Sequence, residues 1–176
     1  TALIILTGRP VIAAELPVQS PYVVEENRGI KALVPDYIKG LKAGVGLGFA
    51  KSAELNGYPG TAHLLELQAV MPLNAEQTRA IIAIRDEMRS ASIALGSDLL
   101  NAEAALEAAF RDRAISRGNL SDLTLQVGAM HAQLQAGNLS AHIRATVLLR
   151  PKQIHRYQVL RGYAGDRIDG HKGRRH

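Results

Sequence analysis

Two histidines and one glutamate have the residue types and spacing of a transition-metal site. His63 and Glu66 stand three residues apart at the start of a segment that reads as helical, so they share one helix face. His142 lies near the end of a later helical segment. The sequence has no cysteine, and imidazole with carboxylate suits nickel, cobalt, zinc or copper. We expect His63, Glu66 and His142 to meet around one ion, with water or a fourth group completing the site.

The other histidines fit this site less well. His131 is eleven residues before His142, close to three helical turns, so the two lie about 16 Å apart along a helix axis and cannot share an ion. His171 and His176, near the end of the sequence, could capture metal only loosely.

Each of the three candidate ligands also has an ordinary structural alternative. His63 could simply stand at a helix start, and Glu66 could be a surface carboxylate favoured by the helix dipole. His142 could be a histidine at a helix seam, bonded to a carbonyl. The sequence shows no Ser-His-Asp or paired-carboxylate arrangement, so we expect a protein that is not an enzyme.

Composition favours an all-α fold in one domain. Of the 176 residues, 47% are hydrophobic but only 4% are aromatic, and there is no Trp. A core made of Ala, Leu, Ile and Val suits helix–helix packing better than a β-sandwich or a base-stacking surface. We therefore expect the candidate ligands to lie on helices.

Two long helices are predicted in the second half of the chain. Asn74 is a good N-cap, and Gln77 can close a capping box with it. Apolar residues then recur every three or four positions as far as Phe110, which predicts one helix of about forty residues. We expect it to end near Gly118, in the left-handed conformation.

The same periodicity continues from Leu120 to about Leu149, and Pro151 is expected to start a last short helix that runs to about Tyr163. Because the connection between the two long helices is short, they must pack antiparallel. The predicted fold is a long antiparallel helical hairpin with short flanking helices, which brings His142 beside the segment that carries His63 and Glu66.

The ends of the chain differ in character from this body. The apolar start and the small residues Val11 and Ala13 are typical of an export signal, and the apolar run is too short to span a bilayer. From Arg150 to His176 there are eight Lys and Arg and two Asp, which gives this stretch a net charge of +6. Because the whole chain has a net charge of +5, residues 1–149 carry −1. We interpret the end as a solvated basic tail rather than a nucleic-acid-binding element. The predicted divisions are a signal remnant (1–14), an extended arm (15–35), a helical-hairpin domain (36–163) and a basic flexible tail (164–176).

Two short motifs resemble a known family. The stretches "LNAEQ" (Leu73–Gln77) and "LRPKQ" (Leu149–Gln153) each open a predicted helix and are separated by the hairpin. They are similar to the twin L-T-x-x-Q motif of the periplasmic Spy/CpxP family and its CnrX-type heavy-metal-sensor relatives, although Asn replaces Thr in the first copy and Arg replaces it in the second. The stretch "NGYPGTAHLLEL" looks like the histidine-containing first helix of the CnrX-type branch.

This resemblance spans about residues 47–163 and implies an exported, non-catalytic, all-helical protein of the Gram-negative periplasm. It implies a homodimer of curved hairpins without a transmembrane segment. CnrX-type members hold a transition-metal ion and report it to a partner, which here would be a membrane-anchored signalling protein. Spy and CpxP members instead act as ATP-independent chaperones for unfolded client proteins, or modulate envelope stress, without metal. We expect the metal-responsive function and keep the chaperone function as the alternative.

Overall fold

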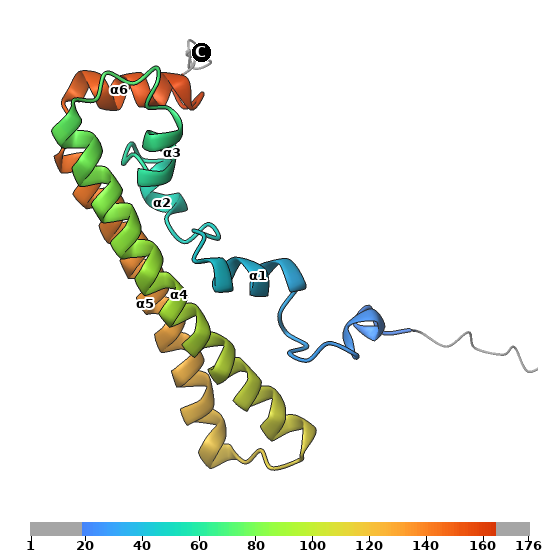
Figure 1. Ribbon diagram of the computed structural model, residues 1–176. Coiled ribbons are helices and arrows are strands. Elements are labelled where there is room, and N and C mark those ends of the chain that lie inside the picture. The colour runs from blue at the N-terminus through green and yellow to red at the C-terminus, as the bar shows by residue number, and fades with distance from the viewer. Residues whose placement is uncertain (1–18, 165–176) are drawn as a thin grey trace, which may run out of the picture.

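The computed structural model describes residues 19–164, and every regular element in that range is helical (Figure 1). The predicted signal remnant (1–14) and all but the first residue of the predicted tail lie outside the described residues. The elements are the single 3-10 turn η1 (Val23–Glu25), α1 (Pro35–Ala43), α2 (Lys51–Glu54), α3 (Thr61–Glu66), α4 (Ala75–Arg111), α5 (Arg117–Val147) and α6 (Pro151–Leu160).

The predicted antiparallel hairpin is confirmed. Helix α4 has 37 residues, α5 has 31, and the two pack against each other along their length. Figure 1 shows α1, α2 and α3 along one side of this hairpin and α6 across one of its ends. We call that end the α6 end. It brings together the last turns of α5, the start of α4 and the short helix α3.

The predicted end of the first long helix was wrong. Helix α4 stops at Arg111, and Arg113 takes the left-handed conformation with a φ of 55°. Ser116 then caps α5 through a capping box with Asn119. This box starts the next helix ahead of Gly118, which lies in the first turn of α5. The capping box at Ser116 therefore sets where α5 begins, and Gly118 does not end the preceding helix.

The short helices attach to the hairpin through two hydrophobic clusters. The first, at the α6 end, has as its buried members Leu64, Met71, Ile81, Ala145, Leu149 and Tyr157. The second holds α1 against the middle of the hairpin through Leu41, Leu99 and Leu134. At this second contact a Cβ on Gly96 would lie 2.7 Å from the carbonyl oxygen of Leu41, so the close approach of α1 to α4 requires glycine at that position.

The two copies of the five-residue motif bond directly to each other. Gln77 and Gln153 exchange two side-chain hydrogen bonds, each with Nε2 3.0 Å from the other Oε1. The same Oε1 atoms accept the backbone N–H groups of Asn74 and Arg150, at 3.0 and 2.8 Å. Each glutamine thus caps its own helix and also bonds to the other glutamine.

The glutamines also bind the chain that leads into the opposite helix. Nε2 of Gln77 donates to the carbonyl of Leu148, and Nε2 of Gln153 donates to that of Pro72, both at 2.7 Å. The entries to α4 and α6 are therefore cross-linked by a nearly symmetric set of bonds, most of them partly buried. Such a network is worth more than its separate bonds, because losing one member leaves several groups unpaired.

No helix within residues 19–164 is both long and apolar enough to cross a membrane.

Replacing Gln153 with Leu tests this network. The change keeps the side-chain size but leaves the Pro72 carbonyl and the Arg150 N–H without their partner and removes both bonds to Gln77, so we expect the free energy of unfolding to fall by about 2 kcal/mol or more. Urea denaturation followed by circular dichroism measures it. The exposed Gln133→Leu on α5 is the control and should change the stability by less than about 0.5 kcal/mol. Equal effects of the two changes would contradict the role of the glutamine pair.

Candidate functional site

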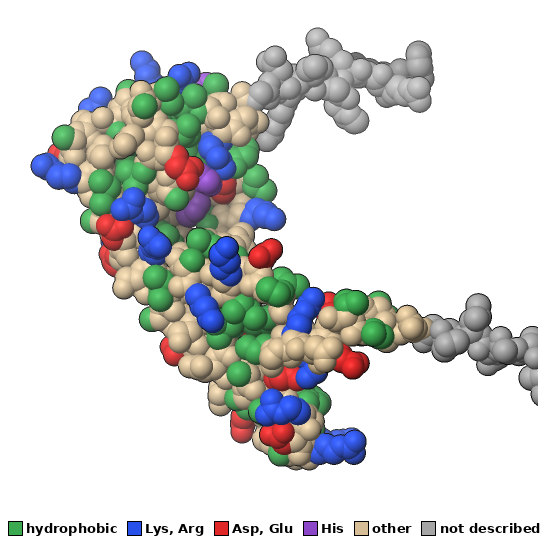
Figure 2. All heavy atoms as spheres, turned by 45° about the vertical axis from the view of Figure 1, so that its right-hand side comes forward, with side chains coloured by type: hydrophobic (Ala, Val, Ile, Leu, Met, Phe, Trp, Pro, Cys, Tyr) green, Lys and Arg blue, Asp and Glu red, His purple; other side chains and the backbone are tan. Residues whose placement is uncertain are grey.

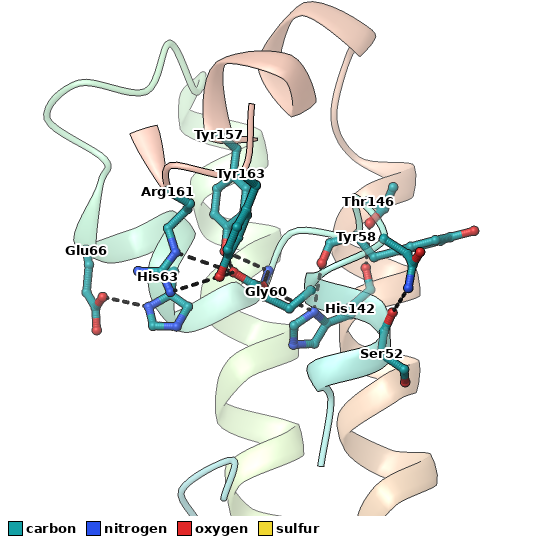
Figure 3. Close-up of polar contacts among 12 residues, drawn as sticks. Ser52, Tyr58, Gly60, His63, Glu66, His142, Thr146, Tyr157, Arg161 and Tyr163 are labelled. Carbon is teal, nitrogen blue, oxygen red and sulfur yellow. Dashed lines mark hydrogen bonds and ion pairs between the residues drawn. The ribbon is translucent and has the colours of Figure 1, made fainter. Parts of the chain in front are cut away.

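The two candidate histidines line one cavity at the α6 end of the hairpin. It has a volume of about 530 Å³ and is walled by α2, α3, the loops on either side of α2, and the facing sides of α4 and α5. His63 comes from α3 and His142 from the last third of α5, as the antiparallel packing predicted. Figure 3 shows the two rings on either side of Gly60.

His63 is paired with Glu66, one helical turn away. Its Nδ1 lies 2.8 Å from Oε2 of Glu66. A carboxylate only accepts, so Nδ1 carries a proton, and in the neutral imidazole Nε2 then has a free lone pair. The Glu66 side chain is 66% exposed, and Figure 3 shows it on the far side of His63 from His142. Glu66 therefore orients the ring of His63 from outside.

His142 is bonded to the backbone of the turn between α2 and α3. Its Nδ1 lies 2.9 Å from the carbonyl oxygen of Tyr58, so this nitrogen also carries a proton. The carboxylate of Glu54 is next to it, with Oε2 3.7 Å from Nδ1. This is the carbonyl-bonded arrangement that the sequence left open as the structural alternative for His142. It leaves Nε2 without a hydrogen bond from any described residue.

Gly60 fits tightly between these groups. A Cβ at this position would lie 2.9 Å from Cε1 and 3.1 Å from Nε2 of His142, and 3.3 Å from Oε2 of Glu54. The N–H of Gly60 donates to that same Oε2 at 3.2 Å. The turn from Gly57, with a φ of 88°, to Gly60 thus holds both its own backbone and the imidazole in fixed positions.

Glu54 lines the same cavity and is the residue there that sequence reasoning missed. Its side chain is only 12% exposed, and it accepts the hydroxyls of Tyr157 at 2.6 Å and Tyr163 at 3.2 Å. Nε of Arg161 lies 3.4 Å from Oε1 and is buried without a hydrogen bond. These partners come from the C-terminal end of the described chain, more than 100 positions away. No local pattern around Glu54 could have indicated them.

Burial raises the pKa of Tyr157 well above its ordinary value, and the carboxylate of Glu54 beside its hydroxyl raises it further. The hydroxyl donates to Glu54 and accepts the N–H of Gly60 at 3.3 Å. Tyr157 is therefore locked as a neutral donor that links α6 to the turn before α3.

The structure brings the predicted ligands together only in part. His63 meets Glu66, whereas His142 meets Glu54 and Tyr58. Within residues 19–164 no three His, Asp or Glu side chains are grouped closely enough to hold an ion as they stand. Ligation of one ion by His63, Glu66 and His142 stays a prediction.

The protonation of Tyr157 can be tested by alkaline titration. We expect its hydroxyl to stay protonated at a pH of about 11, where exposed tyrosines ionise. The rise in tyrosinate absorbance of folded Tyr157→Phe at that pH should then equal that of the unchanged protein. Because its pKa is raised on folding, Tyr157 adds stability below the unfolded value of about 10 and loses that contribution as the pH rises further. A smaller absorbance rise in the variant would contradict this assignment.

Comparison of the sequence with known protein families, with curated proteins and with solved structures gives no match. The function must therefore be argued from the residues and their geometry.

Proposed function

We propose that this chain is a periplasmic, metal-responsive protein of the Spy/CpxP and CnrX type, which binds a transition-metal ion and reports or buffers it. The ion is nickel, cobalt, zinc or copper. The observation that carries the proposal is that two histidines lining one cavity have their Nδ1–H groups held by oxygen acceptors, while both Nε2 atoms remain without a partner among the described residues.

This hydrogen bonding is typical of metal-binding histidines. A ligating imidazole almost always donates its other ring N–H to a carboxylate or a backbone carbonyl, which fixes its tautomer and orientation. His63 donates to Glu66 and His142 donates to Tyr58. The proposal therefore assigns ligation to the Nε2 atoms of His63 and His142, and gives Glu66 the role of orienting His63 in place of the ligand role expected from sequence.

The remaining donors come from the same cavity. Met88 lines it from α4, and a thioether favours copper or acts as a weak axial ligand. Water supplies the other positions, as in sites that keep an open coordination position. Glu54 already accepts bonds from Tyr157, Tyr163 and Gly60, so we assign it a structural role.

Calorimetry with nickel, cobalt, zinc and copper tests the ligand set, using a chain with His171→Ala and His176→Ala to remove loose capture by these two histidines. We expect one saturable site that His63→Ala or His142→Ala abolishes. Glu66→Gln should weaken binding by about 10- to 100-fold, the usual effect of losing an orienting partner.

The exposed His155→Ala on α6 is the matched control and should leave the affinity unchanged. A loss with Glu66→Gln as complete as that with His63→Ala would restore Glu66 as a ligand. Absence of saturable binding by all four metals, or binding unchanged by His63→Ala, would refute the proposed function.

The chaperone alternative is supported by a different observation. Figure 2 shows a bent molecule whose visible face carries hydrophobic side chains among Lys, Arg, Asp and Glu. Around the cavity, the exposed apolar side chains include Val45, Leu55 and Tyr58. Such a face can bind unfolded segments without metal.

For this alternative we expect suppression of aggregation of an unfolded client at a stoichiometric ratio, measured by light scattering. Leu55→Ser should weaken the suppression, and the exposed Ala94→Ser on α4 should not. Tight metal binding by a chain that leaves client aggregation unchanged would exclude the chaperone function.

A further inference from the structure

The cavity at the α6 end is much larger than a metal site requires. Its volume of about 530 Å³ lies in the range of pockets that hold small organic molecules. Most of the side chains in its wall are apolar, and these are Leu47, Ala50, Leu55, Ala62, Met88 and Ala141. An ion ligated by two histidines would leave most of this apolar wall without a partner.

Asn138, on α5, is a buried polar residue with one unused acceptor that faces this cavity. It is 4% exposed and lines the cavity. Its Nδ2 donates to the carbonyl of Leu134 at 2.9 Å and to the hydroxyl of Ser92 at 3.5 Å. Its Oδ1 accepts no hydrogen bond from residues 19–164. A Cβ on Gly46, another residue of the cavity wall, would lie 3.6 Å from this oxygen.

The bonds of Nδ2 fix which end of the Asn138 amide faces the cavity. In the reversed orientation Oδ1 would lie 2.9 Å from the carbonyl oxygen of Leu134, and the two acceptors would repel each other. A buried acceptor without a donor is unfavourable, and native structures normally supply one. For Oδ1 of Asn138, a molecule bound in the cavity can supply it.

The other open polar groups of the cavity can also accept hydrogen bonds. His142 follows Asn138 by one helical turn on the same face, and in the neutral imidazole its Nε2 has a free lone pair. The hydroxyl of Thr61, a residue that is 3% exposed, forms no hydrogen bond within residues 19–164. The carboxylate of Glu54 already accepts three donors. The unused positions therefore suit a ligand that donates.

We propose that this cavity binds a neutral, apolar small molecule of the phenol class. Its ring lies among the apolar side chains, and its hydroxyl donates to Oδ1 of Asn138. Nε2 of His142 offers an acceptor for a second hydroxyl. This function is additional to metal binding and does not rest on it, because Asn138 has no role in the metal proposal. Nε2 of His142 has one lone pair, so an ion bound there prevents a hydroxyl from using it.

The charges around the cavity select a neutral ligand. Lys51 lines the cavity, and its ammonium would repel a ligand that carries an amine cation. A carboxylate ligand would be repelled by Glu54, and it has no proton to donate to Asn138 or His142. A hydroxyl donates without carrying charge. An aromatic ring suits the apolar wall and the thioether of Met88.

Calorimetry on the full chain with three probes of one ring system tests the class of ligand, with EDTA present to remove metal. We expect 2-naphthol to occupy one saturable site. The compound 2-methoxynaphthalene lacks the donor and should bind at least about tenfold more weakly, and the anion 2-naphthoate should not bind detectably. Absence of 2-naphthol binding, or binding of either other probe as tight as that of 2-naphthol, would overturn the proposal. Failure of the metal proposal would leave these results unchanged.

Gly46→Leu tests where the probe binds. Gly46 has no positive φ, and a Cβ there would meet only Oδ1 of Asn138, at an ordinary contact distance. The backbone therefore tolerates a side chain that fills the cavity in front of Asn138, and we expect 2-naphthol binding to be lost. Gly29→Leu is the matched control, because a Cβ on Gly29 would meet no atom within 4 Å. It should bind 2-naphthol as the unchanged protein does.

Asn138→Leu removes the proposed acceptor and keeps the approximate size of the side chain. It should weaken 2-naphthol binding at least about tenfold, with circular dichroism showing the same helix content as the unchanged protein. If this buried change prevents folding, Gly46→Leu decides the question, because it leaves the hydrogen bonds of Asn138 in place. Unchanged 2-naphthol affinity in Gly46→Leu, or in folded Asn138→Leu, would overturn the proposal.

Discussion

The reciprocal hydrogen bonds between Gln77 and Gln153 are the constraint on which the α6 end of the molecule depends. They join the first turn of α4 to the first turn of α6, and they bind the carbonyls of Pro72 and Leu148, which precede those helices. Hydrophobic packing alone fixes separations loosely, whereas paired amides fix both distance and direction. The orientation of α6 across the hairpin follows from this pair.

That orientation in turn positions the cavity. With α6 in place, Tyr157 reaches Glu54, and Glu54 holds the N–H of Gly60. The turn around Gly60 then presents the carbonyl of Tyr58 to His142. Residues 54–60 and residues 142–157, two stretches that are distant in sequence, are thus linked by hydrogen bonds that converge on the turn before α3.

Much of this fold could be predicted because its signals are local. The periodicity of α4 and α5 and the cap at Asn74 depend on residues that are close in sequence. They predict the hairpin, and with it that His63 and His142 lie at the same end of the hairpin. Two kinds of feature escaped. The sequence offers two signals near the end of α4, a helix stop at Gly118 and a helix start at the capping box of Ser116. Residue spacing alone does not show which of the two the chain follows. The environment of Glu54 depended on tyrosines about 100 residues later, brought near only by tertiary packing.

The contacts of Glu54 also join the turn at Gly60 to Tyr163, which lies about 100 residues later in the chain. One carboxylate touches the backbone of Gly60, at the edge of the His142 ring, and the hydroxyl of Tyr163, next to the last described residue. The oxygen nearer the imidazole accepts the N–H of Gly60, and the other oxygen of the same group accepts the hydroxyl of Tyr163. The carboxylate of Glu54 thus connects the cavity to Tyr163, which follows α6 in the chain.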